Sequence, residues 1–236
     1  MDKIDVQKKQ KKTAVIFDLD GTLWDAAETI APAWNAYLAG REIELRMTPD
    51  ACRACCGKTL PEIAAMLFPE AEPGWREEVI VGCCDAECVP LAKLGGRLYP
   101  DLESVLETLH RDHFLAVVSN CGLGYIEAFF SGNHTGRYFD DYENAARTGL
   151  SKGENIRLVM ERNGIERAVY VGDTEGDRQA ALRAGVPFIH AAYGYGSVEG
   201  SEHSRIVAPS QLPGVVKQLI AEGGKPDAPS RSPEDS

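Results

Sequence analysis

The stretch Thr13-Ala-Val-Ile-Phe17 is followed directly by Asp18-Leu-Asp-Gly-Thr22. The first five residues are mostly apolar and include β-branched side chains, a composition typical of a buried strand. The next five contain Gly21 and two aspartates, which indicate a turn. The sequence therefore predicts a buried strand whose carboxyl end carries the side chains of Asp18 and Asp20.

Strands and helices alternate along the chain after Gly95-Gly96. Such alternation predicts a parallel sheet with helices on both faces. We therefore expect an α/β fold built on a doubly wound parallel sheet. The further predicted strands are Phe114–Val118, Ala168–Val171 and Val186–Ile189, and the predicted helices are Asp101–His110, Lys152–Asn163 and Gly176–Ala184.

Residues 26–96 have a different pattern. They are Ala-rich and amphipathic, as in Leu60–Phe68, and contain no convincing strand. We expect them to form a small α-helical domain inserted after the first strand. The remaining predicted parts are a core domain of residues 13–25 and 97–222, a flexible polar leader at 1–12 and a disordered Pro- and Ser-rich tail at 223–236.

Composition limits the possible partners. The chain has 236 residues, of which 44% are hydrophobic, enough for a substantial core. Its formal net charge of -11 argues against a broad nucleic-acid-binding face. No apolar run approaches the roughly 20 residues that span a bilayer, and the N-terminus does not resemble a secretory signal. We expect a cytoplasmic protein with no membrane or nucleic-acid partner, and its oligomeric state stays open.

Polar side chains follow three of the predicted strands. Asp18 and Asp20 follow the first, Ser119 and Asn120 the second, and Asp173 the third. In open α/β sheets, ligands bind at the edge formed by the carboxyl ends of the strands. The sequence therefore predicts a ligand site at this edge.

Asp18 and Asp20 lie two residues apart on an extended end, so their side chains can face the same side. Two carboxylates this close cannot both stay ionised unless a cation lies between them or one holds a proton. A metal would leave Asp18 free to act as a nucleophile, and a proton would make Asp20 a general acid. Gly21 permits the turn, and the Thr22 hydroxyl can tie it. The alternative is a turn that only caps the next helix.

A second acidic turn, Gly172-Asp-Thr-Glu-Gly-Asp177, follows a second predicted strand. Its carboxylates suit a hard cation such as Mg²⁺, which prefers oxygen ligands. The alternative is a helix N-cap at Asp173 with an acid in the first helical turn at Asp177.

Three further residues could contact a phosphoryl group. Ser119 and Asn120 could donate hydrogen bonds to its oxygens, and Lys152 could neutralise both the nucleophile and the phosphate. The alternatives are helix capping for the first two residues and a solvated side chain for the lysine.

Together these segments resemble the haloacid dehalogenase-like hydrolase superfamily from about Thr13 to Leu219. The resemblance implies a Rossmann-like core with a small helical cap, which closes over the site and selects the substrate. The motifs that carry it occur in the family's order: Asp18-Leu-Asp-Gly-Thr22, Ser119-Asn120, Lys152 and Gly172-Asp-Thr-Glu-Gly-Asp177.

The resemblance also implies a role for each matching residue. Asp18 would form an aspartyl-phosphate, and Asp20 would protonate the leaving group and then activate water. Ser119 and Lys152 would hold the transferring phosphoryl group. The implied activity is a magnesium-dependent phosphatase acting on a small phosphorylated metabolite. The implied Mg²⁺ ligands are Asp18, the backbone carbonyl of Asp20 and Asp173, with Asp177 assisting.

Tyr193-Gly-Tyr195-Gly and Gly57-Lys58 resemble phosphoglycolate phosphatases within this superfamily. Phosphoglycolate is therefore a candidate substrate. Lys58 is a candidate substrate-binding residue of the cap, with a solvated lysine as the alternative. Trp24-Asp25-Ala26 departs from the family's common pattern, and Trp24 is expected to reshape the floor of the pocket.

Two other functions remain as alternatives. A phosphosugar mutase of the same superfamily also keeps both aspartates of the first motif, and a catalytically silent binding protein could keep the fold. Asp20 argues against relatives that cleave carbon–halogen or carbon–phosphorus bonds, because they lack this second carboxylate. The seven cysteines are expected to be mostly reduced thiols. Core packing is expected for the cap cysteines, with a zinc site or redox switch as the alternative: Cys52, Cys55, Cys56, Cys84 and Cys88.

Overall fold

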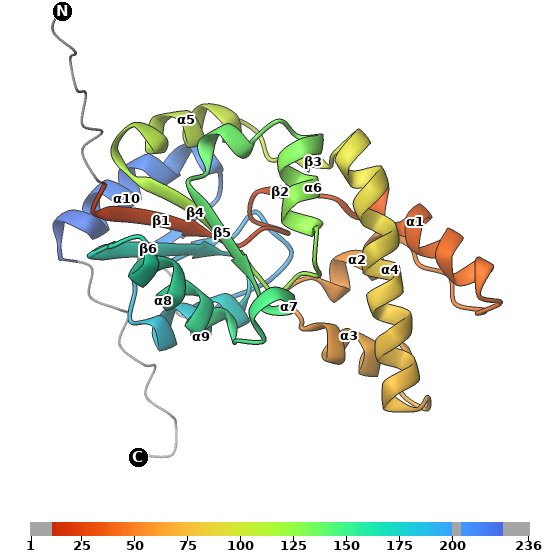
Figure 1. Ribbon diagram of the computed structural model, residues 1–236. Helices are drawn as coiled ribbons and strands as arrows, with labels where there is room; N and C mark the ends of the chain where they lie inside the picture. Colours follow the sequence, from red (N-terminus) through yellow and green to blue (C-terminus); the bar gives the residue numbers. More distant parts are fainter. Residues whose placement is uncertain (1–10, 200–203, 224–236) are drawn as a thin grey trace, which may run out of the picture.

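The computed structural model describes residues 11–199 and 204–223. Most of the predicted leader and nearly all of the predicted tail lie outside these ranges. Within them, a six-stranded parallel sheet has the order β5-β4-β1-β6-β7-β8 (Figure 1). Its strands are β1 Thr13–Phe17, β4 Phe114–Ser119, β5 Asp141–Asn144, β6 Arg167–Gly172, β7 Phe188–Ala191 and β8 Arg205–Ile206.

Strand β1 lies in the middle of the sheet and is buried on both faces. Val15 and Phe17 belong to one hydrophobic cluster, whereas Ala14 and Ile16 belong to another. This division follows the two-residue period of a strand. This buried central strand therefore carries Asp18 to the centre of the sheet's carboxyl edge.

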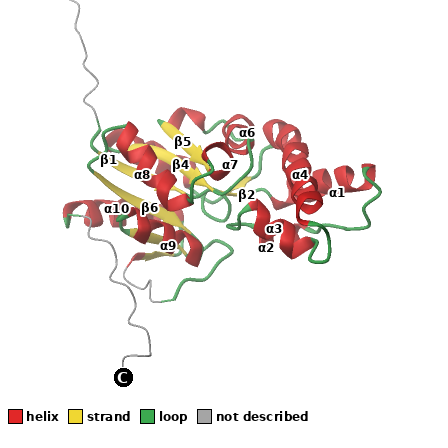
Figure 2. Cartoon of the chain, turned by 60° about the horizontal axis from the view of Figure 1, so that its bottom comes forward, coloured by secondary structure: helices red, strands yellow, loops and turns green. Residues whose placement is uncertain are grey.

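Helices cover both faces of the sheet, as the sequence predicted (Figure 2). One layer contains α5 Leu102–Asp112 and α10 Leu212–Ala221, and the other contains α8 Lys152–Arg162 and α9 Glu175–Ala184. The short helix α7 Ala145–Thr148 follows β5. The α/β doubly wound class is thus confirmed.

A second group of helices lies beside the carboxyl edge of the sheet (Figures 1 and 2). Its members are α1 Ala27–Gly40, α2 Pro49–Cys55, α3 Leu60–Leu67 and α4 Pro73–Leu94. Helix α4 packs on α1, on α3 and on α6 Tyr125–Gly132 of the sheet-bearing part. The chain enters and leaves this group through a two-stranded antiparallel ribbon of β2 Trp24–Asp25 and β3 Arg97–Leu98.

Several elements in the described part of the structure were not predicted from the sequence, among them β5, α6, α7, β8 and α10. Strand β5 reads Asp-Tyr-Glu-Asn, a polar composition that does not resemble a buried strand. Arg162 pairs with both acids of this strand, at 2.7 Å from Asp141 and 2.7 Å from Glu143. Strand β7 begins two residues later than the predicted strand at Val186.

Close backbone contact joins α4 to α6. A β-carbon at Gly132 would lie 2.1 Å from the carbonyl oxygen of Leu91. The side-chain amide of Asn133 pairs with both backbone groups of Gly96, at 3.1 Å from its nitrogen and 2.7 Å from its oxygen. These contacts fix the returning chain against the sheet-bearing part.

We expect Gly132→Ala to lower the free energy of unfolding by about 1–3 kcal/mol, because the added methyl group must push two backbones apart. Gly40→Ala is the matched control, since Gly40 is also the last residue of its helix and has nothing within 4 Å of the added carbon. Urea denaturation of both variants measures the difference. Equal stabilities would contradict the close contact.

Candidate active site

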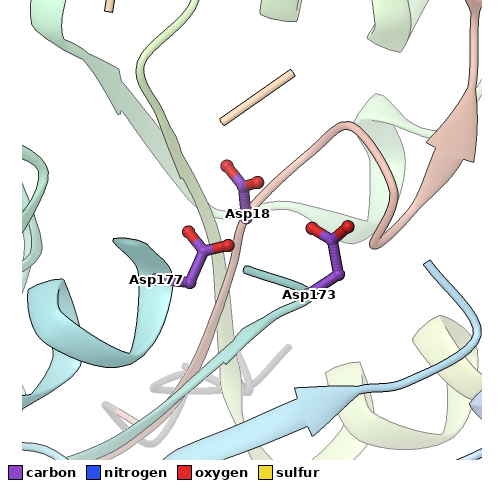
Figure 3. Close-up of side chains that lie close together, drawn as sticks. All are labelled: Asp18, Asp173 and Asp177. Carbon is purple, nitrogen blue, oxygen red and sulfur yellow. The ribbon is translucent and has the colours of Figure 1, made fainter. Parts of the chain in front are cut away.

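Three buried carboxylates converge at the carboxyl edge of the sheet. Figure 3 shows the side chains of Asp18, Asp173 and Asp177 pointing toward one another. Each offers an oxygen within 4.8 Å of the others'. Asp18 is fixed at the end of β1 by its backbone N–H, which donates to the carbonyl of Val171 on β6 at 2.8 Å. The sheet thus gathers acids from distant parts of the sequence.

Lys152 supplies a buried positive charge within this cluster. Its Nζ donates to Asp18 Oδ1 at 2.9 Å and to Asp177 Oδ1 at 2.7 Å. A capping box of Ser151 and Glu154 starts α8, which places Lys152 in the first helical turn with its side chain directed inward. The solvated alternative for this lysine is therefore wrong, because its side chain is only 6% exposed.

Asp177 has two roles in the structure. Its Oδ2 accepts hydrogen bonds from the backbone N–H and the hydroxyl of Thr174, at 3.0 and 2.6 Å, and so caps α9. Its Oδ1 faces Lys152. The N-cap residue is Thr174, so the alternative with Asp173 as N-cap is wrong. The same side chain, that of Asp177, therefore caps α9 and belongs to the carboxylate cluster.

Backbone amides from another loop hold Asp173. Its Oδ2 accepts from the N–H groups of Tyr195 and Gly196, at 2.8 and 3.1 Å. Gly194 allows this approach, since a β-carbon there would lie 2.3 Å from the carbonyl oxygen of Gly21. The sequence marked Tyr193-Gly-Tyr195-Gly only by resemblance, whereas the structure shows that this segment orients Asp173.

The cluster fits a divalent metal ion. Asp173 Oδ1 is buried and has no hydrogen-bond partner among residues 11–199 and 204–223. A buried carboxylate oxygen without a partner is costly, and a cation would satisfy it. The all-oxygen donor set is of the kind that Mg²⁺ prefers. In the described ranges, this is the only group of at least three His, Cys, Asp or Glu residues arranged to hold a metal ion.

Asp20 is oriented by two donors. Its Oδ1 accepts from the Trp24 indole N–H at 2.9 Å and from the Tyr125 hydroxyl at 2.8 Å. Trp24 is fully buried and packs edge-on against Tyr125 and Phe129. Trp24 does not line the cavity described below, so the expectation that it reshapes the floor of the pocket is replaced by this positioning contact.

A small cavity lies between the sheet's edge and helices α1–α4. Its volume is about 60 Å³, and Asp20, Ser119 and Asn120 line it from the sheet side. Asn120 Nδ2 also donates to the carbonyl of Gly57 at 3.0 Å, across to the loop between α2 and α3. Lys58 lines the cavity from this loop, but it is exposed and its Nζ donates to Ala54 O at 2.9 Å.

Thr22 does not tie the turn through its hydroxyl, because its buried Oγ1 has no hydrogen-bond partner in the part of the chain that the structure describes. Instead, the hydroxyl of Tyr193 donates to the backbone carbonyl of Thr22 at 2.9 Å. The tie that the sequence assigned to Thr22 is thus made by another residue.

The sequence of this chain is similar to those of known proteins. The family model "Haloacid dehalogenase-like hydrolase" matches residues 15–191. The chain belongs to this family. A phosphoglycolate phosphatase of Rhodobacter capsulatus is 30% identical over 191 residues, which cover 77% of this chain and 85% of the relative. One of Aquifex aeolicus is 29% identical over 188 residues, with the same coverage. The chain is thus an enzyme of the phosphoric monoester hydrolase class.

Solved structures show the same fold. A haloacid dehalogenase-like hydrolase from Streptococcus pneumoniae superposes with a TM-score of 0.72 at 18% identity, over 86% of this chain and 98% of that one. CbbY from Rhodobacter sphaeroides, solved with phosphate, has a TM-score of 0.70 at 21% identity, over 85% of this chain and 96% of that one.

The cysteines do not form a metal site in the structure. All seven are free thiols, and Cys52, Cys55, Cys83 and Cys84 are buried in the main hydrophobic cluster. Burial raises the pKa of these four thiols, so they stay protonated. Core packing is therefore confirmed for these residues. No described helix has the combination of length and apolar character that crossing a membrane requires.

Burial raises the pKa of three carboxyl groups at the site, those of Asp18, Asp20 and Asp173. Burial, followed by the charge of Asp177, raises the pKa of Asp18 to about 7. Burial likewise raises the pKa of Asp20 to about 7 and that of Asp173 to about 6. Burial alone would lower the pKa of Lys152, but Asp177 and Asp18 raise it above its ordinary value.

The raised pKa values of Asp18, Asp20 and Asp173 predict that the effect of Mg²⁺ on stability depends on pH. Between about pH 4 and 7 the metal-free folded state holds protons that the unfolded chain has released, so these groups contribute less stability as pH rises. Mg²⁺ replaces the protons, so we expect its stabilisation to be larger at pH 8 than at pH 5.5 by about 1 kcal/mol or more. Urea unfolding with Mg²⁺ or EDTA at both pH values measures it, and equal Mg²⁺ effects would contradict the prediction.

Proposed function

We propose that this chain hydrolyses the phosphate monoester of a small metabolite, with Mg²⁺ bound and with Asp18 as the covalent nucleophile. The observation that carries the proposal is the buried contact of Lys152 with both Asp18 and Asp177. The ammonium group of Lys152 holds the nucleophile in place. Asp20 is held at the adjacent cavity by hydrogen bonds from Trp24 and Tyr125.

In the first step, a carboxylate oxygen of Asp18 attacks phosphorus and the ester P–O bond breaks. Asp20 gives its proton to the departing alkoxide oxygen, a role that its raised pKa favours. In the second step, Asp20 takes a proton from water, whose oxygen attacks phosphorus and displaces the Asp18 carboxylate. The products are inorganic phosphate and an alcohol, and both aspartates return to their starting forms.

The other predicted residues support these steps. Ser119 and Asn120, at the end of β4, would donate hydrogen bonds to the phosphoryl oxygens, while Lys152 balances the charge on Asp18. Thr22 belongs to the same turn as Asp20 and is a further candidate substrate-binding residue, with a buried hydroxyl that has no partner in the described part of the chain. When bound, Mg²⁺ supplies positive charge for the phosphoryl oxygens. Its proposed ligands are Asp18, the backbone carbonyl of Asp20, Asp173 and Asp177.

Helices α1–α4 would act as a cap that closes over the leaving group. This assignment divides the chain into a core of residues 13–25 and 97–222 and a cap of 26–96. The position of the cavity between the two parts supports it. The named relatives are phosphoglycolate phosphatases, so phosphoglycolate is a first substrate to test, with Lys58 as the candidate cap contact.

Arg53 of α2 would help to hold the cap closed. Its Nη2 lies 3.0 Å from Asp25 Oδ2 at the entry to the cap, where Arg97 and the hydroxyl of Tyr195 also contact the same carboxylate, at 2.9 and 2.8 Å. Burial alone would raise the pKa of Asp25, but hydrogen bonds from Arg53 and Tyr195 hold it below its ordinary value.

Asp18→Asn should reduce phosphate release from p-nitrophenyl phosphate with Mg²⁺ by about a thousandfold or more, because the amide cannot attack phosphorus. Asp112→Asn, an exposed aspartate of α5, is the matched control and should keep full activity. A colorimetric phosphate assay measures both. Activity that survives Asp18→Asn would refute the nucleophile.

Isotopic oxygen from solvent distinguishes hydrolysis from phosphoryl transfer to a sugar. Because water attacks phosphorus in the second step, we expect phosphate released in H₂¹⁸O to contain one solvent oxygen. Mass spectrometry of the phosphate measures this. Absence of the label, together with transfer of phosphate to an added sugar, would favour the mutase. No turnover of any phosphate ester would favour the silent binding protein.

Arg53→Met should lower kcat/KM by about three- to tenfold, because the cap loses an ion pair to a buried carboxylate. Arg46→Met is the control, since Arg46 is exposed in the same segment and has no ion pair or hydrogen bond in the described part of the chain. Steady-state kinetics compare the two variants. Equal kcat/KM values would mean that Arg53 does not hold the cap.

A further inference from the structure

The wall of the cavity that faces away from the sheet contains one carboxyl group. Glu87 of α4 lines the cavity together with Trp34 of α1 and the thiol of Cys84. Asp20 lines the same cavity from the sheet side. A leaving group that departs from phosphorus past Asp20 would therefore extend toward Glu87.

Glu87 is deeply buried and only partly satisfied. The residue is 4% exposed. Its Oε2 accepts a hydrogen bond from the indole N–H of Trp34, and its Oε1 has no hydrogen bond to any residue in 11–199 or 204–223. Oε1 is not among the fully enclosed atoms that lack a partner, so it is open to the cavity that Glu87 lines. Within a substrate cavity, such an atom is an acceptor for a donor that the substrate brings.

No buried cation balances this carboxyl group from the cavity wall. Among the described lining residues, Lys58 is the only Lys or Arg, and it is exposed and hydrogen-bonded to the backbone of α2. The neighbouring Arg53 does not line the cavity and is paired with Asp25. Burial raises the pKa of Glu87 well above its ordinary value, and the charge of Asp20 acts in the same direction.

We propose that the substrate's leaving group ends in a hydrogen-bond donor, a hydroxyl or an alkylammonium group, which Glu87 Oε1 accepts. This proposal rests on the proposed phosphatase function and names its substrate class. A leaving group that ends in a carboxylate, such as that of phosphoglycolate, would place a full negative charge beside Asp20 and Glu87, where the described cavity wall offers no buried cation to pair with it. The cavity of about 60 Å³ has room for a leaving group of a few heavy atoms.

Four esters of similar length test the proposal: 2-aminoethyl phosphate, 2-hydroxyethyl phosphate, phosphoglycolate and ethyl phosphate. The values of kcat/KM are compared with that of ethyl phosphate, which has no terminal polar group. We expect at least one donor ester to exceed ethyl phosphate by about tenfold or more, and phosphoglycolate to fall below it. Phosphoglycolate that equals or exceeds both donor esters would overturn the proposal without any variant.

Glu87→Gln isolates the carboxyl group, because the amide oxygen can still accept from Trp34. We expect this variant to reduce the ratio of the preferred donor ester to ethyl phosphate by about tenfold. Each ratio is taken within one protein, so it does not depend on the fraction that is folded. Glu77→Gln, an exposed glutamate on the same helix, is the matched control and should leave the ratios unchanged.

The outcomes distinguish a hydroxyl donor from an ammonium donor. They also distinguish failure of the leaving-group proposal from failure of the proposed phosphatase function. A larger loss for the aminoethyl ester supports an ammonium group, and a larger loss for the hydroxyethyl ester supports a hydroxyl group. Unchanged ratios in Glu87→Gln would overturn the role of Glu87. If p-nitrophenyl phosphate is hydrolysed but the selectivity is absent, only this inference fails. If neither p-nitrophenyl phosphate nor any of the four esters is hydrolysed, the proposed function fails and this inference fails with it.

Discussion

Three buried carboxylates share one ammonium group at the carboxyl edge of the sheet. Asp18, Asp173 and Asp177 lie within a few ångströms of one another, and Lys152 contacts two of them. Charges buried this way are stable only when they are paired and hydrogen-bonded. The surrounding structure provides these hydrogen bonds. Backbone amides of Tyr195 and the next residue donate to Asp173, the capping box of α9 holds Asp177, and β1 fixes the backbone of Asp18. Three carboxylates and one ammonium group leave an excess of negative charge, which favours the binding of a divalent cation.

In the proposed mechanism, the same edge of the sheet separates the reacting end of a substrate from its leaving group. The phosphoryl side is formed by short contacts among residues at strand and helix ends. The leaving-group side is formed by helices that the chain reaches and leaves through the β2–β3 ribbon. Membership of the hydrolase family accounts for the first side. The cavity wall with Glu87 is formed by helices α1–α4, and the proposed substrate class is argued from that wall.

The sequence predicted the parts of the fold that depend on local pattern. The strands β1, β4 and β6 are apolar runs, and the polar residues at their carboxyl ends were identified from position alone. Strand β5 was missed because its acids are neutralised by Arg162, a partner distant in the sequence. The hydrogen bonds from Tyr195 to Asp173 and from Tyr125 to Asp20 likewise join segments that are distant in the sequence, so spacing does not reveal them. The burial of Glu87 also depends on packing between separate helices.

The covalent role of Asp18 is the central claim, and trapping the acyl phosphate tests it most directly. Turnover of a phosphate ester with Mg²⁺ is quenched with acid, and the protein is treated with borohydride, which reduces an acyl phosphate to homoserine. Peptide mass spectrometry then locates the modified residue. The account predicts homoserine at position 18, only when substrate was present. Homoserine at position 20 instead, or at neither position while turnover proceeds, would contradict it.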